Sequence, residues 1–148
     1  MTGPRPTELR VAATAPTVVR ALQAEAVLDV LERSARPGER PEETLLDRGL
    51  VDDRELALEL SLRSGLPYAG LRGFIPDPKL FLYVPVATAV AQRVCPLVLV
   101  DDSLKLASAY LYPDLLAVRM RFPNLDLDLV IVPRDELLDA LRLVAPEL

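Results

Sequence analysis

The spacing of hydrophobic residues changes along this chain from a helical period to a strand period. Early in the chain, apolar residues recur three and four positions apart, as on one face of a helix: Val19, Leu22, Ala26, Val27, Val30 and Leu31. From Pro96 onward they form short runs or alternate with polar residues, as strands do. This change predicts helices in the first part of the chain and a mixed α/β arrangement in the second.

Glycine and aspartate mark the ends of two short helices between Pro41 and Gly65. Gly49 and Gly65 end the helical runs, because glycine adopts the left-handed conformation of a helix C-terminus at little cost. Asp52, with Glu55 three residues later, has the pattern of a capping box at a helix start. We predict a compact helical hairpin. The leucines expected to be buried on its second helix are Leu56, Leu60 and either Leu58 or Leu62.

Two strands, a helix, a strand and a final helix are predicted after Pro96. The runs 97–100 and 104–107 are separated by Asp101-Asp102-Ser103, residue types that favour tight turns. A helix from Pro113 to about 122, a strand over 127–132 and a helix beyond Pro133 follow. The fold class is therefore α+β, with a helix and a short helical hairpin packed on a ββαβα sandwich that has a three-stranded sheet.

The same pattern predicts how the chain is divided. Residues 1–16 contain three prolines and little hydrophobic pattern, so we expect a flexible N-terminal arm. A helical subdomain over 17–66 follows. Residues 67–95 are expected to form a linker and one helix, and residues 96–148 the ββαβα subdomain.

The composition is poor in catalytic groups. The 148 residues include no histidine and one cysteine, Cys95, which therefore has neither a base nor metal-ligating partners. Asp101 and Asp102 have the chemistry of a turn, whereas Asp126 and Asp128 alternate with leucines along the wet side of a strand. We predict no catalytic residue, no metal site and no cofactor.

Charge and hydropathy narrow the class of partner. The net charge is −5 and the basic residues are scattered, which argues against nucleic-acid binding. The longest apolar region, Val84–Val100, is interrupted by Pro85, Gln92, Arg93 and Pro96, so no direct membrane insertion is expected. With one cysteine and no signal pattern, the chain is predicted to be cytoplasmic.

The remaining function is the docking of another protein, and two surfaces qualify. The first predicted helix has a broad apolar stripe that includes Leu22 and Val27. The second helix of the hairpin has a charged side made of Arg54, Glu55, Glu59 and Arg63.

A series of short motifs runs through residues 40 to 145. They are Leu45-Leu46, Gly49-Leu50-Val51, Gly65-Leu66-Pro67-Tyr68, Leu71, Val84-Pro85, Cys95-Pro96-Leu97 and Leu106-Ala107. In this order they resemble the N-terminal domain of the type II secretion and type IV pilus assembly ATPases. The resemblance implies a helical front on a small α/β sandwich that docks the motor onto an inner-membrane platform.

The motor's own phosphate-binding loop has no counterpart here. That loop reads GxxxxGK[ST], and neither Lys79 nor Lys105 follows a glycine. The resemblance therefore implies a non-catalytic interaction module, stand-alone or excised. Its partner would be a platform component or a related regulator.

One subgroup of this family binds cyclic di-GMP, and its motif is degenerate in this chain. Arg40 matches the opening arginine, Gly49 matches the central glycine, and Arg63 stands where a glutamine would be. Pro41 and Glu42 replace the leucine and glycine after the arginine, and the carboxylate adds bulk and repulsion near phosphate. A cyclic di-GMP sensor using Arg40, Gly49 and Arg63 remains the alternative function, but the sequence argues against this ligand.

Overall fold

The computed structural model describes Ala26, Asp29 and residues 41–146. These residues divide into two compact units, with the division between Val51 and Asp52. It falls inside the helical subdomain predicted over 17–66. Ala26 and Asp29 are helical and exposed, although Ala26 was expected on an apolar stripe. Most of the predicted first helix, the N-terminal arm, and the candidate residues Leu22, Val27 and Arg40 lie outside the described residues.

The first unit contains helix α3, Pro41–Asp47, which ends at a glycine as predicted. Gly49 has a φ of 68°, and the amide of Leu50 donates to the carbonyl of Leu45 over 3.0 Å. These features close the helix C-terminus. Leu45 is fully buried, and so is the side chain of Glu42.

The second unit begins with α4, Asp53–Ser64, whose two ends confirm the predicted signals. The Glu55 amide donates to Asp52 Oδ1 over 2.7 Å, and the Asp52 amide donates to Glu55 Oε1 over 2.9 Å. This is the predicted capping box. Gly65 ends the helix with a φ of 74°.

Removing this cap should destabilise the domain modestly. Asp52→Ala is expected to lower the free energy of unfolding by about 1 kcal/mol, because the amide of Glu55 loses its acceptor. Urea denaturation followed by circular dichroism measures the change. Asp128→Asn removes one exposed charge outside any helix and is expected to leave the midpoint nearly unchanged. An equal loss in both variants would contradict a capping role.

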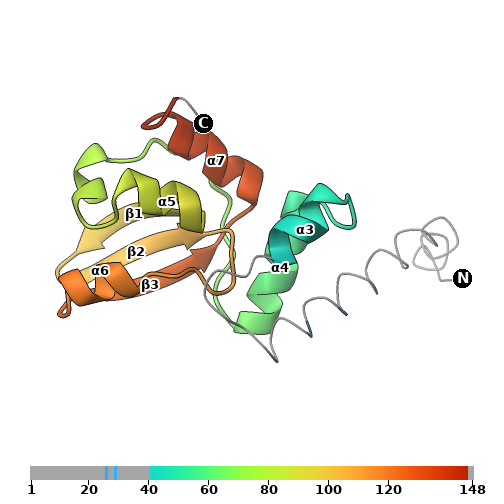
Figure 1. Cartoon of the computed structure of the whole chain (residues 1–148), viewed down its shortest axis with the longest axis horizontal. Coiled ribbons are helices and arrows are strands. Elements are labelled where there is room, and N and C mark those ends of the chain that lie inside the picture. The colour runs from blue at the N-terminus through green and yellow to red at the C-terminus, as the bar shows by residue number, and fades with distance from the viewer. Residues whose placement is uncertain (1–25, 27–28, 30–40, 147–148) are drawn as a thin grey trace, which may run out of the picture. The chain divides into compact units, whose positions relative to one another are not determined.

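A three-stranded sheet forms the centre of the second unit (Figure 1). Its strands are β1, Val94–Val100, β2, Ser103–Ser108, and β3, Asp126–Ile131. β1 pairs antiparallel with β2, whereas β2 pairs parallel with β3. The hairpin and third strand are as predicted, except that β1 begins before Pro96.

Four helical segments complete the sandwich: η1, Pro78–Leu82, α5, Val86–Gln92, α6, Leu116–Arg121, and α7, Arg134–Arg142. The rings of Tyr83 and Phe122 lie 5.1 Å apart, and the amide of Asp114 donates to Gln92 Oε1 over 2.8 Å. These contacts join the ends of η1 and α5 to α6. Among the helical segments that the structure describes, η1 was not predicted, because the sequence that leads into it was interpreted as an irregular linker.

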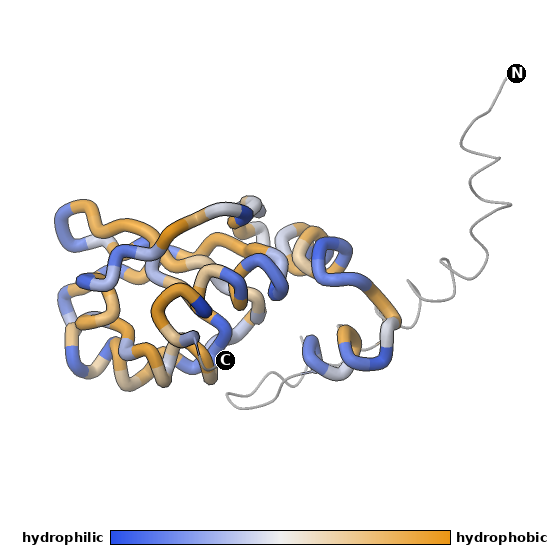
Figure 2. The backbone as a smooth tube through the Cα atoms, turned by 90° about the horizontal axis from the view of Figure 1, so that it is seen from above, coloured by the Kyte–Doolittle hydropathy of each residue, from blue (hydrophilic) through white to orange (hydrophobic). Residues whose placement is uncertain are grey.

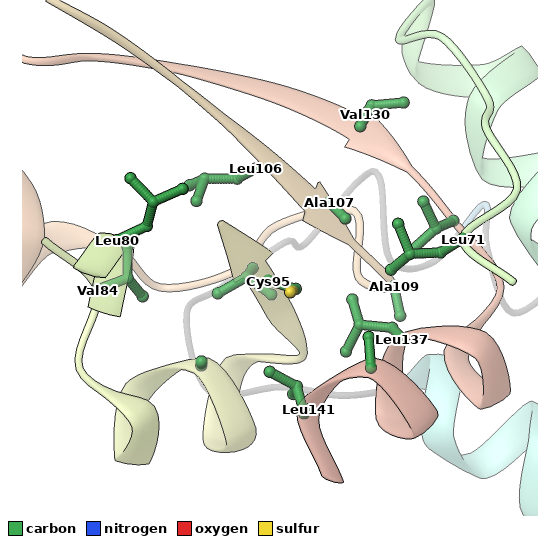
Figure 3. Packing of buried hydrophobic residues seen from close by; sticks show 14 of the residues in the cluster. Leu71, Leu80, Val84, Cys95, Leu106, Ala107, Ala109, Val130, Leu137 and Leu141 are labelled. Carbon is green, nitrogen blue, oxygen red and sulfur yellow. The ribbon is translucent and has the colours of Figure 1, made fainter. Parts of the chain in front are cut away.

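The core lies between the sheet and these helices (Figure 3). Leu104 and Leu106 of β2 are fully buried, while Lys105 between them is exposed. Leu137 and Leu141 are fully buried on α7. Along the backbone of the sandwich, hydrophobic segments alternate with short hydrophilic ones (Figure 2). The predicted α+β fold class is therefore confirmed.

The free edge of the sheet at β1 is interrupted by a proline. Pro96 is buried within the strand, and the register with β2 shifts between Pro96 and Val98. Proline lacks an amide donor and is tolerated in a sheet at edges and bulges. This edge is therefore a poor template for adding another strand.

Candidate docking site

The outward side of α4 exposes two leucines. Leu58 is 40% exposed and Leu62 is 80% exposed, whereas Leu56 and Leu60 are buried. Residues four apart lie on the same side of a helix, and each residue is rotated by about 100° from the next. Leu58 and Leu62 therefore form one stripe that faces away from the core. The prediction that one of them is buried was wrong.

Charged side chains border this stripe. Arg54 and Glu55 are exposed, and Glu59 is partly buried. We name Arg54, Glu55, Leu58, Glu59 and Leu62 the α4 outer face. An exposed apolar pair with charges at its rim has the composition of a small docking surface.

Arg63 differs from the other charged residues predicted on this helix. Its side chain is only 12% exposed, and its Nε lies 2.9 Å from Glu59 Oε2. The guanidinium therefore lies along the helix surface, where it orients Glu59. The structure brings Arg63 next to the α4 outer face and leaves little of it for a partner.

The opposite side of α4 is held by α7. Asp53 Oδ2 lies 3.3 Å from Arg134 Nε and accepts from the amide of Asp135 over 3.0 Å. The contacts of Asp53 with Arg134 and Asp135 fix which side of α4 faces outward.

Burial raises the pKa of the Asp135 carboxyl, and repulsion from Asp53, Glu136 and Asp139 raises it further. A hydrogen bond from the Glu136 amide lowers this pKa and partly offsets the rise.

The residues of the alternative nucleotide site are distributed over different parts of the chain. Arg40 lies outside the described residues, Gly49 follows α3 in the first unit, and Arg63 lies on α4 in the second. Glu42, which replaces a glycine of the cyclic di-GMP motif and was expected to repel a phosphate group, is 2% exposed.

Cys95 is fully buried in β1. Burial raises the pKa of its thiol to about 12. The thiol therefore stays protonated at neutral pH, whereas the thiolate is the reactive form.

Cys95 should resist thiol reagents until the domain unfolds. At pH 8, a thiol-reactive dye is expected to label the native chain far more slowly than the chain in urea, because the thiolate is both scarce and inaccessible. Absorbance at matched protein concentration measures the two rates. Equally rapid labelling of the native chain would contradict the burial.

The acidic residues at the hairpin end of the sheet line a shallow hollow with Val98, Val100 and Lys105. They are Asp101, Asp102, Asp126 and Asp128, all exposed. Among the described residues, no three His, Cys, Asp or Glu side chains are grouped so that they could hold a metal ion.

Sequence reasoning missed an apolar face on α6. Leu116 is 62% exposed and Met120 is 73% exposed, and they lie one helical turn apart. Arg119 and Arg121 are also exposed. The four-residue spacing within the predicted helix was the available signal, but the sequence did not show which apolar residues would face the core. Only Val118 of this helix is buried.

No helix in the described part of the chain has both the length and the apolar character needed to span a membrane.

Comparison with known proteins shows what the chain is similar to. The family model of the MshEN domain matches residues 64–147. Two solved structures of the N-terminal domain of XpsE are each 25% identical to the chain. One covers 96% of this chain and 98% of the other with a TM-score of 0.55. The second covers 80% and 94% with a TM-score of 0.57.

A structure of MshE with cdg is also similar in fold. It is 24% identical, with 81% of this chain and 86% of the other covered and a TM-score of 0.54. A search of the curated proteins found no match. The family match begins at Ser64, so it covers the sandwich and leaves most of α4 outside.

Proposed function

Because this chain belongs to the MshEN domain family, we propose that it is a non-catalytic docking module of a secretion or pilus machine. The similarity to the N-terminal domain of XpsE supports this assignment, and so did the sequence resemblance. The α4 outer face is the surface that a partner holds. The proposed partner is the cytoplasmic part of an inner-membrane platform component, so the chain works in the cytoplasm.

The observation that carries this proposal is the exposure of Leu58 and Leu62 on a helix whose other side is fixed to α7. Covering them with apolar side chains of a partner would remove their surface from water, which is the main favourable term in association. The charged rim adds orientation and speed of encounter rather than affinity. The face is small, so a few apolar contacts would supply most of the binding energy.

Isothermal titration tests this proposal directly. The chain is titrated with the purified cytoplasmic segment of the platform component from the same organism. Saturable binding is expected, with affinity that depends on Leu62 and changes little with salt, since the apolar contacts dominate. Absence of heat at high micromolar concentrations of both proteins contradicts the proposed partner.

Cyclic di-GMP sensing is the second candidate, and the MshE structure with cdg favours it. The sequence predicted that this chain does not bind cyclic di-GMP, and the similarity to the MshE structure does not support that prediction. In this chain Arg63 would be the residue that contacts phosphate, as a charge-assisted donor. It would have to leave Glu59, from which it is 2.9 Å distant.

A titration with cyclic di-GMP separates the two candidates. Docking without nucleotide binding predicts no saturable heat for the wild-type chain. Saturable heat that disappears in Arg63→Ala, but persists in the matched variant Arg54→Ala, would establish the sensor function instead. Arg54 lies on the same helix and is exposed, so it controls for the loss of one charge.

A further inference from the structure

The outward side of α6 is an apolar stripe with a positive rim. Leu116, Ala117 and Met120 are exposed, while Val118 points inward and is 3% exposed. Arg119 and Arg121 flank the stripe. We name these exposed residues the α6 outer face. Its two arginines give this face a positive charge, whereas the chain as a whole has a net charge of −5.

The two arginines of this face keep their charge available. Within the part of the chain that the structure describes, neither guanidinium takes part in an ion pair. Arg121 lies over the ring of Phe122, 5.5 Å from its centroid, which holds the side chain beside the stripe. Methionine and arginine with apolar neighbours are the residue types that interfaces favour. The face therefore suits an apolar helix bordered by carboxylates.

The α4 outer face has that description. Leu58 and Leu62 have the same four-residue spacing as Leu116 and Met120, and Glu55 and Glu59 lie at their rim. Arg54 is the one positive side chain of that face. We propose that the α6 outer face of one copy of this chain binds the α4 outer face of a second copy. The leucines and methionine would pack together, and the arginines would face the glutamates.

This contact is head-to-tail, because the two faces are different. Each bound pair leaves one α4 face and one α6 face open, so further copies can add to form a ring or an open chain. Pairing of two α6 outer faces would place their arginines together. The stripes are short, so the association is weak and is populated only at high protein concentration. This inference goes beyond the proposed function, and a platform component bound to α4 would compete with it.

Sedimentation velocity on two complementary variants tests the inference. The wild-type chain is expected to sediment faster as its concentration rises into the high micromolar range. Leu62→Asp disables the α4 face and Met120→Asp disables the α6 face, so each variant alone should remain monomeric. An equimolar mixture should form a dimer and nothing larger, because each variant supplies the face that the other lacks.

Controls separate this inference from misfolding and from failure of the proposed function. Leu82→Asp changes an exposed leucine outside both faces and should associate like the wild type. Leu62→Ser and Met120→Ser repeat the mixing experiment if an aspartate variant does not fold. Met120→Asp should still bind the platform segment. A wild-type chain that stays monomeric throughout, or a mixture that stays monomeric while the wild type associates, overturns the inference.

Discussion

Leu106→Ala is expected to lower the free energy of unfolding by about 2 to 5 kcal/mol. Leu106 is fully buried in the central strand β2 and belongs to the same hydrophobic core cluster as Leu80 of η1 (Figure 3). Truncation removes apolar contacts and leaves a cavity that the surrounding strands and helices fill only in part. Because a domain of this size is stable by only about 5 to 15 kcal/mol, this loss is a large fraction of the total.

Urea denaturation followed by circular dichroism measures this effect. Leu116→Ala is the matched control, because it makes the same chemical change at a side chain that is 62% exposed. The control is expected to change stability by less than about 0.5 kcal/mol. Similar losses in the two variants would mean that β2 is not the centre of the core.

Leu62→Asp is expected to weaken binding of the platform segment by about thirtyfold or more, the effect of losing a central apolar contact. Leu62 is 80% exposed, so a charge there costs the free chain little. In the complex, the same carboxylate would be buried against apolar side chains. Isothermal titration measures the change, after circular dichroism has shown that the variant is folded.

The control for this variant is Leu82→Asp, another exposed leucine at 72%. Its affinity should stay within about twofold of the wild type, the scatter expected for residues outside an interface. Loss of binding in Leu82→Asp with retention in Leu62→Asp would move the docking surface to η1.

The ends of helix α4 could be predicted from the sequence because they depend on single residues. Asp52 and Gly65 set the ends of α4 through hydrogen bonding and a positive φ, and both properties belong to the residue type. The alternation of leucine and aspartate in β3 likewise predicted which side of that strand is wet. These features are local, so tertiary packing did not need to be known.

The direction of the apolar faces was harder to predict because tertiary contacts decide it. α4 carries leucines on both sides, and only its contacts with α7 show that Leu60 faces inward and Leu62 outward. On α6, Leu116 is exposed although its neighbour Leu115 is buried. A sequence with leucine on two sides of a helix predicts the helix but leaves its orientation open.

Hydrogen exchange of the chain, with and without the platform segment, tests the central claim most directly. The claim is that a partner holds this domain by the α4 outer face. Slower exchange is predicted in peptides covering 54–64 when the segment is bound, with the core strands unchanged. Binding that leaves those peptides unaffected and protects another part of the surface would contradict the account.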